Sequence, residues 1–377
     1  MSPPSSARPS TSSSARPSVD SARSSASSSS FVSQDKEWLP ALVAKYGVST
    51  STTWIEDRYA VWRSPNHTHS NPRVQGYLPR GKFYFAWGPP LCRDDEVVRK
   101  EVAEEFLRWA TKDKHKRVVW CCVDSKFAEM LGQDFNWSVL ACVKEDVLQP
   151  DIKKLDNKEV RHNIRRADKH HVKYDELKLK APTWLPAEEI KEEIEHGLER
   201  WKANRHGTQI AAAGLHPWLD AQHRRYFIAR DEHKKIVAIC VLASLAHDSY
   251  QIKHAVTFPD APSGTSEGIL GHVIREMQFE GRGSLTFGAS AQDEIHPEYN
   301  LGGWKVKMLG KAYKKIVSKY GLANRSQFRH KFGTEDNALH VAYEPGTFGW
   351  QGLLALMKAS PIAPLFFPFP PSLCDLY

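Results

Sequence analysis

The stretch SYQIKHAVTFPDAPSGTSEGILGHVIREMQ, residues 249–278, contains a strand pattern, a tight turn and a helix pattern in succession. Its first eight residues have the composition of a strand. Pro262 and Gly264 predict a tight bend, and Ser263 or Thr265 is expected to cap the helix that follows. A strand that leads through a turn into a helix is the basic unit of α/β proteins, so we expect this class for the chain.

Strand and helix patterns of the same kind fill two blocks of similar size. Runs of β-branched and aromatic residues predict strands at 82–90, 117–123, 138–143, 225–230, 235–246, 284–290 and 338–343. Apolar residues at helical spacing predict helices at 94–110, where Asp94 or Asp95 is the cap, and at 185–201 and 305–321. The turn composition of DEHK, 231–234, predicts an antiparallel hairpin. We therefore predict an α/β (α+β) fold of two tandem lobes, with mixed sheets flanked by helices.

We divide the chain into four segments: a disordered Ser-rich tail (1–34), an N-terminal lobe (35–155), a basic connecting helix with a C-terminal lobe (156–348), and an apolar tail (349–377). Half of residues 1–30 are serine, and SSARPS occurs at 5–10 and again at 13–18. Such a segment buries too little apolar surface to fold. A transit peptide is the alternative, but the segment lacks the amphipathic apolar face of such peptides.

The apolar tail is interrupted by prolines and is too short to span a bilayer. Contact with a membrane surface and docking on the protein's own core are both open interpretations. No run of 18 apolar residues occurs in the chain, so we predict no spanning helix.

The overall composition favours a folded protein with an anionic partner. The chain has 377 residues, 41% of them hydrophobic, and a net charge of +8. Most of its six cysteines lie in apolar runs without a C-x-x-C pair, which predicts buried free thiols in a reducing compartment. Cys121 and Cys122 are neighbours in a predicted strand, so they are expected to point to opposite faces.

Two segments concentrate positive charge. Lys154, Lys158, Arg161, Arg165 and Lys169 recur at spacings of three or four, which places them along one side of a helix, with Arg166 beside them. Residues 301–334 contain nine Lys or Arg and no acid. Solvated helix faces usually mix both signs to gain ion pairs, so a nucleic acid or a phospholipid surface is favoured over two plain solvated faces.

The turn in FPDAPSGTSEGIL, residues 258–270, is the best candidate for chemistry. Free backbone N–H groups at the start of its helix can receive a phosphate or an oxyanion. Glu267 stands in the first helical turn, where a carboxylate is also favoured for purely structural reasons. The sequence contains no Walker loop, G-x-S-x-G or H-E-x-x-H motif, and its histidines lack a third ligand at usable spacing, so we predict no metal.

Four stretches in this order resemble the C-terminal domain of bacterial phosphatidylglycerol lysyltransferases and its fungal relatives, the sterol aminoacyltransferases. They are NKEVRHNIRRADKHHVKY (157–174), FPDAPSGTSEGILGHVI (258–274), LTFGAS (285–290) and SQFRHKFGTEDNALHVAY (326–343). The resemblance spans about residues 54–345. It implies two tandem acetyltransferase-like lobes, a charged tRNA as amino-acid donor, a lipid hydroxyl as acceptor, and no cofactor. A free-standing chain is most similar to the fungal enzymes that esterify ergosterol with glycine.

The resemblance and the charge pattern together give the expected site residues. Glu267 is expected as base or substrate orienter, with Lys331 and Arg165 as charge stabilisers. The residues expected to bind tRNA are Lys158, Arg161, Arg165, Arg166, Lys311, Lys314 and Lys315. The donor amino-acid or oxyanion pocket is expected to contain Lys253, Ser263, Gly264, Thr265 and Arg329. We also expect a cytoplasmic protein that associates peripherally with membranes.

The sequence departs from the bacterial pattern at Lys253, where those proteins carry an acid. A lysyl donor would meet a cation there, which leaves the amino acid open. The rival functions are an aminoacyl-phosphatidylglycerol synthase, a coenzyme A-dependent acetyltransferase and a non-catalytic protein that binds tRNA or membranes. The acetyltransferase would need a pyrophosphate loop of the Arg/Gln-x-x-Gly-x-Gly/Ala kind before a helix, and the chain lacks this pattern.

Overall fold

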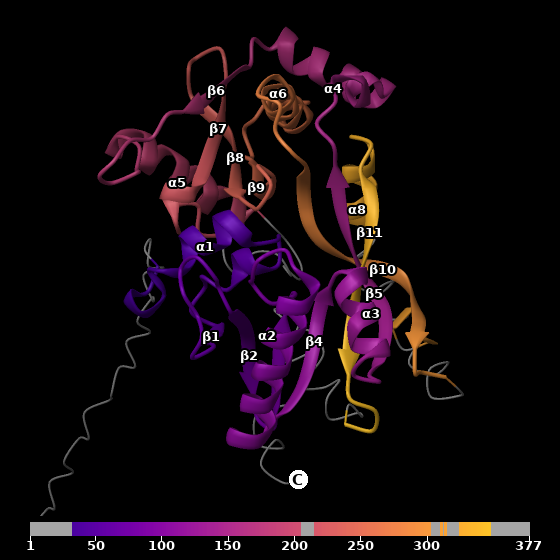
Figure 1. Cartoon of the computed structure of the whole chain (residues 1–377). Helices are drawn as coiled ribbons and strands as arrows, with labels where there is room; N and C mark the ends of the chain where they lie inside the picture. Colours follow the sequence, from indigo (N-terminus) through magenta and orange to yellow (C-terminus); the bar gives the residue numbers. More distant parts are fainter. Residues whose placement is uncertain (1–31, 205–214, 303–309, 312, 315–323, 348–377) are drawn as a thin grey trace, which may run out of the picture.

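The described part of the chain is built around one sheet of eleven strands (Figure 1). The structure is a computed structural model, which describes residues 32–204, 215–302, 310–311, 313–314 and 324–347. The strands are β1 (Ala60–Arg63), β2 (Val74–Arg80), β3 (Phe83–Trp87), β4 (Arg117–Val123), β5 (Ser138–Leu148), β6 (Lys173–Leu177), β7 (Arg224–Arg230), β8 (Ile236–Ser244), β9 (Tyr250–Thr257), β10 (Leu285–Tyr299) and β11 (Glu335–Tyr343). Their order is β1-β2-β3-β4-β11-β5-β10-β9-β8-β7-β6.

Seven α-helices flank this sheet in the described residues. They are α1 (Leu39–Tyr46), α2 (Glu96–Arg108), α3 (Ser125–Gln133), α4 (Lys158–Lys169), α5 (Glu188–Ala203), α6 (Thr265–Phe279) and α8 (Asn324–His330). The expected cap of the second helix is confirmed at Asp95, whose carboxylate accepts from the backbone N–H groups of Val97 and Val98. The mixed α/β class, the hairpin of β7 and β8, and the turn that leads from β9 into α6 are confirmed.

The last strand crosses back into the N-terminal half of the molecule. β11 lies antiparallel to both β4 and β5, so residues from the end of the chain separate two strands from its first half. β5 is paired with β10 on its other side. The boundary expected near residue 155 stays a prediction, but the sheet is continuous across it, and β5, β10 and β11 join the two lobes.

Opposite faces of the C-terminal half bury different helices. Phe227 and Leu242 pack with residues of α4 and α6, whereas their neighbours Tyr226 and Val241 pack with residues of α5. This alternation follows from the two-residue period of a strand. Tyr226 and Phe227 are fully buried, and burial of each such ring contributes about 2 kcal/mol. The helices are therefore held at fixed positions on the sheet, and α4 is one of them.

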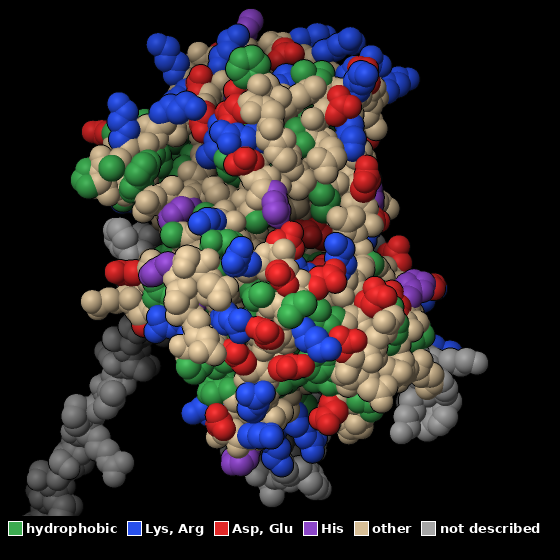
Figure 2. Space-filling model, viewed as in Figure 1, with side chains coloured by type: hydrophobic (Ala, Val, Ile, Leu, Met, Phe, Trp, Pro, Cys, Tyr) green, Lys and Arg blue, Asp and Glu red, His purple; other side chains and the backbone are tan. Residues whose placement is uncertain are grey.

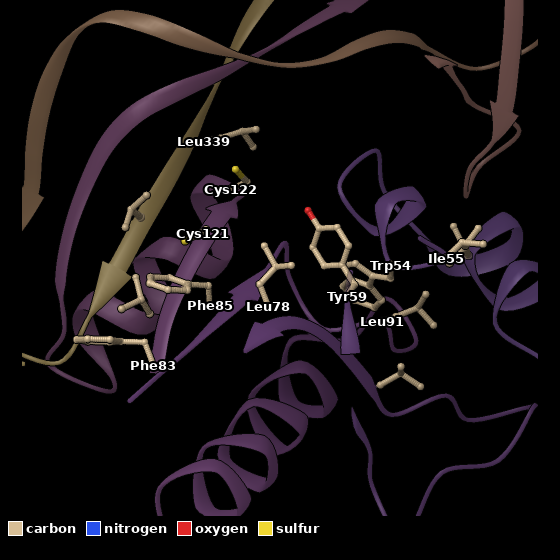
Figure 3. Packing of buried hydrophobic residues seen from close by; sticks show 14 of the residues in the cluster. Trp54, Ile55, Tyr59, Leu78, Phe83, Phe85, Leu91, Cys121, Cys122 and Leu339 are labelled. Atoms are coloured by element: carbon tan, nitrogen blue, oxygen red, sulfur yellow. The ribbon is translucent and has the colours of Figure 1, made fainter. Parts of the chain in front are cut away.

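The core of the N-terminal half corrects the expectation for the two neighbouring cysteines. Cys121 and Cys122 both lie in the cluster that contains Phe85, Tyr59 and Leu339 (Figure 3). Cys122 has a φ of 57°, and the pairing of β4 with β11 shifts register at this point. A bulge inserts one extra residue and interrupts the alternation of faces, so the prediction of opposite faces was wrong.

Parts of the sequence-based prediction lie outside the described residues. Among them are most of the Ser-rich tail, the apolar tail, Lys315, and most of the helix expected at 305–321. No helix in the described part of the chain is long and apolar enough to cross a membrane.

Candidate functional site

The sheet opens between β9 and β10. The last residue pair of these parallel strands is Gln251 with Thr286, close to the start of both strands. Beyond it Ala255 and Ala289 are exposed, although β9 and β10 lie in the interior of the strand order. β10 runs instead alongside β5 (Figure 1). We call this opening the β9–β10 gap, and the exposure of Ala255 and Ala289 shows that the two strands are open to solvent there.

Polar side chains meet where the gap closes. The Thr286 hydroxyl donates to Oε1 of Glu145 on β5 at 2.7 Å and accepts from the backbone N–H of Gly288 at 2.9 Å. Oε1 of Gln251 accepts from the hydroxyl of Thr52 at 2.6 Å. A Cβ on Gly288, where φ is +77°, would lie 2.6 Å from Nε2 of Gln251. The positive φ favours glycine at this position, and a larger residue would also have to displace the Gln251 amide.

Arg329 lies on the β5 side of the gap. Its Nη1 donates to Oδ2 of Asp146 at 2.5 Å, and its guanidinium lies 5.5 Å from the centre of the Phe287 ring. The Asp146 side chain is fully buried, and the Ser290 hydroxyl donates to the same oxygen at 3.1 Å. A buried carboxylate requires a charged partner, so Arg329, expected in the substrate pocket, also neutralises Asp146.

Three side chains that could bind a metal ion lie at the Arg329–Asp146 pair, and the side chain of Lys144 contacts two of them. Ligand atoms of Asp146, His330 and Asp336 are within 4.8 Å of one another. Nζ of Lys144 lies 2.6 Å from Oδ2 of Asp336 and 3.3 Å from Nε2 of His330. The Lys144 ammonium and the Arg329 guanidinium both bring positive charge to this cluster, so its two carboxylates take part in ion pairs.

Lys253 lies on β9 at the opposite wall of the gap. Its Nζ donates to the Thr52 hydroxyl at 3.1 Å and lies 3.7 Å from Oε1 of Glu56. Burial lowers the pKa of Lys253 to about 8, and Glu56 only partly opposes this effect. An ammonium group at this position is therefore charged at neutral pH and poorly solvated.

The turn before α6 differs in detail from the prediction. Gly264, with a φ of 90°, is the residue that precedes the helix, and no side chain caps it. The expected cap at Ser263 or Thr265 was therefore wrong: Ser263 is exposed, and the buried Thr265 uses its hydroxyl to donate to the carbonyl of Pro262. A left-handed residue at this position reverses the chain, which only glycine does without strain.

Glu267 lies at the contact of α6 with the basic helix. Its Oε1 accepts from Nδ2 of Asn163 on α4 at 2.7 Å, and its Oε2 accepts from the Ser266 hydroxyl at 2.6 Å. Glu267 is buried. Lys331 forms an ion pair with Glu159 on the same helix. Glu159 and Asn163 are four residues apart, so α4 brings Lys331 and Glu267 to one of its faces.

The rest of α4 is an exposed basic surface. Lys158, Arg161, Arg165, Arg166 and Lys169 are all exposed, and Lys and Arg side chains gather over this helix in Figure 2. Val160 and Ala167 are buried and anchor the opposite side. Because Arg165 follows Asn163 by two residues on a helix with 3.6 residues per turn, it is directed away from Glu267. The structure therefore does not bring Arg165 together with the other two expected catalytic residues.

The second basic segment is described only in part. Lys311 and Lys314 are exposed, and Lys314 pairs with Glu294 of β10 at 2.8 Å. The segment has no acid of its own, yet the fold supplies one from a neighbouring strand.

A family model described as phosphatidylglycerol lysyltransferase, C-terminal, matches residues 41–343. This range includes the whole described sheet and every element of the site. The chain belongs to this family. Membership identifies it as an aminoacyltransferase that uses aminoacyl-tRNA as co-substrate and modifies a membrane lipid.

Solved structures agree with membership of the lysyltransferase family. L-PGS from Bacillus licheniformis is 15% identical, with a TM-score of 0.66 over 87% of this chain and 96% of that chain. The C-terminal domain of a putative lysylphosphatidylglycerol synthetase from Agrobacterium fabrum is 15% identical, with a TM-score of 0.67 over 86% of this chain and 95% of that chain. At these identities the likeness shows the fold. A search of curated proteins found no match.

Sequence reasoning missed several residues of the site in this family member. Glu145, Asp146, Thr52, Gln251 and Glu56 meet at or near the gap, but none stands in a recognisable motif. Their roles depend on which strands are neighbours. The only local signal was the acidic pair Glu145–Asp146 shortly after the apolar strand predicted at 138–143, because a charge that becomes buried needs a partner.

Proposed function

We propose that this enzyme moves an amino acid from charged tRNA to a hydroxyl group of a membrane lipid at the β9–β10 gap. The observation that carries the proposal is the packing of the exposed basic helix α4 against the start of α6. Asn163 and Glu267 join the two helices directly. A polyanion bound along α4 would thereby have its end beside buried polar groups that are shielded from water.

The basic surface of α4 is the proposed tRNA site. Five exposed cations on one helix attract a phosphate backbone through counterion release. Lys311 and Lys314 are exposed cations of the second segment and extend the proposed site. Phosphate contacts of this kind position a nucleic acid without reading its sequence.

The reaction needs positioning more than a covalent intermediate. The lipid oxygen forms a bond to the aminoacyl carbonyl carbon, and the bond from this carbon to the ribose oxygen breaks. The hydroxyl proton leaves the lipid oxygen, and the departing ribose oxygen takes up a proton. We assign Glu267 as the residue that takes or orients the proton, and Lys331 as the cation that stabilises developing negative charge. Arg165, which was expected beside them, is directed away from Glu267 and is assigned to the tRNA-binding surface of α4 alone.

The donor pocket is proposed at Lys253, Ser263, Gly264, Thr265 and Arg329. The backbone N–H groups at the start of α6 can donate to an oxyanion. The buried ammonium of Lys253 disfavours a second cation at close range. A lysyl side chain, named in the family description, is therefore a poor ligand for the region around Lys253.

The acceptor is proposed to be the 3β-hydroxyl of ergosterol, and the resemblance to fungal enzymes favours glycine as the transferred amino acid. Phosphatidylglycerol is the alternative acceptor, because the family description names it. Either lipid requires peripheral association with a membrane, which we assign to the apolar tail 349–377.

A coenzyme A-dependent acetyltransferase is the main rival enzyme. Its pyrophosphate would have to bind at the turn before α6. The carbonyl oxygen of Asn163 lies so close to Gly264 that a Cβ there would be only 2.0 Å from it, so α4 packs against the Gly264 side of this turn and reduces the room for a pyrophosphate. We expect no thermal stabilisation by acetyl-CoA. A non-catalytic tRNA-binding protein would form no aminoacyl lipid, so an assay of turnover distinguishes it from the proposed enzyme.

The test uses the full chain with charged tRNA and vesicles that contain ergosterol or phosphatidylglycerol. We expect an aminoacyl ester of the lipid, and ribonuclease treatment should abolish it because the donor is the tRNA ester. Product from free amino acid and ATP without tRNA would overturn the assignment. Ester on phosphatidylglycerol alone would replace the acceptor and leave the donor chemistry intact.

Glu267→Gln keeps the size of the side chain and removes the carboxylate. If Glu267 takes the proton, turnover should fall by on the order of 100-fold with little change in stability. Turnover within a few-fold of wild type would leave Glu267 as the residue that joins α6 to α4.

A further inference from the structure

A third group of cations gathers at the opposite end of the molecule from α4. Figure 2 shows Lys and Arg side chains at the lower end of the view, whereas α4 lies at the upper end in Figure 1. We call this group the β3–β4 basic patch, and its members are Arg80, Lys82, Lys112, Lys114, Lys116 and Arg117. Lys116 is half-buried, and the other five are exposed.

The pairing of β3 with β4 assembles the patch from two separate stretches. RGK, 80–82, leads from β2 into β3, and KDKHKR, 112–117, leads from the end of α2 into β4. The two strands are parallel, with Phe83 opposite Arg117, so both stretches lie at the same edge of the sheet. Nζ of Lys116 donates to the carbonyl oxygen of Gly81 at 2.8 Å. The strand order therefore concentrates more charge than either stretch has alone.

The cations of the patch lack ion pairs. None of the six lies within ion-pair distance of a carboxylate among the described residues, whereas Lys314 of the second basic segment pairs with Glu294. Two acids, Asp113 and Glu344, lie in the same region, so six cations exceed the acids by four. Like charges at close range repel one another, and an anionic surface relieves this repulsion.

Two aromatic rings lie beneath the patch. Nζ of Lys114 is 5.8 Å from the centre of the Trp109 ring, and Nζ of Lys116 is 5.9 Å from the centre of the Tyr84 ring. The two rings are stacked on each other with their centres 5.6 Å apart, and both are half-buried. Trp and Tyr combine an apolar ring with a polar atom, which suits the headgroup level of a bilayer.

The described chain ends at the patch. Thr347 is its last residue, and the carbonyl oxygen of Thr347 accepts from Nη1 of Arg117 at 3.4 Å. The sequence that follows has eight Leu, Ile or Phe residues between 353 and 369. One apolar anchor holds a protein only weakly on a bilayer, whereas an apolar anchor beside a polybasic surface binds stably. The fold places the start of the apolar tail at the polybasic surface.

We propose that the β3–β4 basic patch docks the enzyme on a membrane that contains anionic phospholipids. The lipid headgroups supply the negative charge that the fold does not provide at this end of the molecule. A nucleic acid is the other polyanion that six cations could hold. The start of the apolar tail beside Arg117 favours the membrane, because an RNA backbone offers no apolar partner to Leu and Phe side chains. This docking goes beyond the proposed transfer reaction and does not depend on it.

The patch anchors the enzyme at a distance from the reacting groups. β4 runs from Arg117 at the patch to Val123, and a strand of seven residues spans about 20 Å. The β9–β10 gap closes at Glu145, and β5 reaches this residue beyond the one that lies level with Val123. Loss of charge from the patch should therefore weaken membrane binding without changing the chemical step.

The test measures co-sedimentation of the full chain with vesicles of phosphatidylcholine, with and without phosphatidylserine. The variant combines Lys82→Gln, Lys112→Gln and Lys114→Gln. A lysine near an anionic bilayer strengthens binding by about fivefold, so this variant should bind the phosphatidylserine vesicles on the order of 100-fold more weakly. Added salt should weaken binding of the wild type more than binding of the variant.

The matched control removes the same net charge from another part of the surface. It combines Lys180→Gln, Lys202→Gln and Lys234→Gln, three exposed lysines of the C-terminal half. The control should bind both kinds of vesicle as the wild type does. Equal weakening by the two triple variants would show that only the net charge matters and would overturn the proposal. Equal binding of the wild type to vesicles with and without phosphatidylserine would also overturn it.

Two further measurements separate the membrane from tRNA and from the reaction. In filter binding, the patch variant should hold tRNA as tightly as the wild type, and a loss of tRNA affinity with unchanged vesicle binding would assign the patch to nucleic acid instead. In the transfer assay, the patch variant should need more vesicles for half-maximal rate and keep its kcat, and a lower kcat at saturating vesicles would contradict an anchoring role. Vesicle binding is measured without tRNA, so absence of transfer by the wild type contradicts the proposed function alone.

Discussion

Replacement of Gly264 by alanine tests the contact on which the site depends. Gly264 has a φ of 90°, and a Cβ there would lie 2.0 Å from the carbonyl oxygen and 2.7 Å from the carbonyl carbon of Asn163. These are backbone atoms of α4, so no side chain can turn away to make room. Gly264→Ala must therefore displace α4 from the start of α6.

Two separate contributions lower the free energy of unfolding of Gly264→Ala, and they add. An L-residue in the left-handed region costs roughly 1–2 kcal/mol, and overpacking against a fixed neighbour costs roughly 1–3 kcal/mol. The expected loss in the free energy of unfolding is therefore about 2–5 kcal/mol. For a chain of this size that corresponds to a fall in Tm of roughly 3–6 °C.

Gly281→Ala is the matched control at the other end of α6. Gly281 also has a positive φ, of 63°, but no atom lies within 4 Å of the position of its Cβ. It should lose only the conformational part, about 1 kcal/mol. Thermal and urea unfolding of both variants measure the difference, and filter binding measures tRNA affinity, which should fall only for Gly264→Ala. Equal destabilisation of the two variants would refute the close packing of α4 on this turn.

Four further predictions follow from the site and the tail. Arg329→Met leaves a buried carboxylate on β5 without its guanidinium and should destabilise the chain by about 3 kcal/mol in urea unfolding. Because burial lowers the pKa of Lys253 to about 8, the unfolded chain binds this proton more tightly, so the Lys253 contribution to stability rises between about pH 8 and 10.5. Lys253→Met should flatten that rise in unfolding measured against pH, and an unchanged slope would contradict the burial. Arg161→Ala with Arg165→Ala should weaken tRNA binding and reduce its salt slope by about two units. Deletion of residues 360–377 should reduce co-sedimentation with liposomes, and undiminished binding by a folded truncation would contradict a role of the tail in membrane contact.

The sequence predicted most of the secondary structure because the signals for it are local. The basic helix, for example, is indicated by the spacing of Arg161, Arg165 and Lys169, and it occurs as α4. The strand, turn and helix from residue 249 to 278 occur as predicted. Runs of β-branched residues, Pro262 and glycine determine the backbone conformation only of residues close to them in the sequence, so their effect can be predicted without the fold. The predicted helix cap was one residue away from the observed cap at Gly264. Ser263 and Thr265 were chosen because their side chains commonly cap helices. The conformation that requires glycine at 264 depends on the contact with α4, which the sequence does not reveal.

Only the tertiary structure decided which residues share the site. β11 lies between β4 and β5, and nothing in the residues of these strands specifies that order. The pairing of Arg329 with Asp146 and of Glu267 with Asn163 follows from it and from the position of α4. Periodicity fixes which face a side chain occupies but carries no information about the neighbour across that face.

By itself, then, the sequence determined the mixed α/β class, the basic helix and, through four ordered motifs, the resemblance to a family of lipid aminoacyltransferases. The tertiary structure decided where the sheet opens, that a bulge makes Lys253 an extra residue in β9, and that Arg224 is buried without an ion pair to a carboxylate of the described residues. The physical reason is the distance along the chain over which each effect acts. Backbone preference and hydrophobic period act over a few residues, whereas the electrostatic balance of a buried site sums charges that the fold brings together from distant parts of the chain.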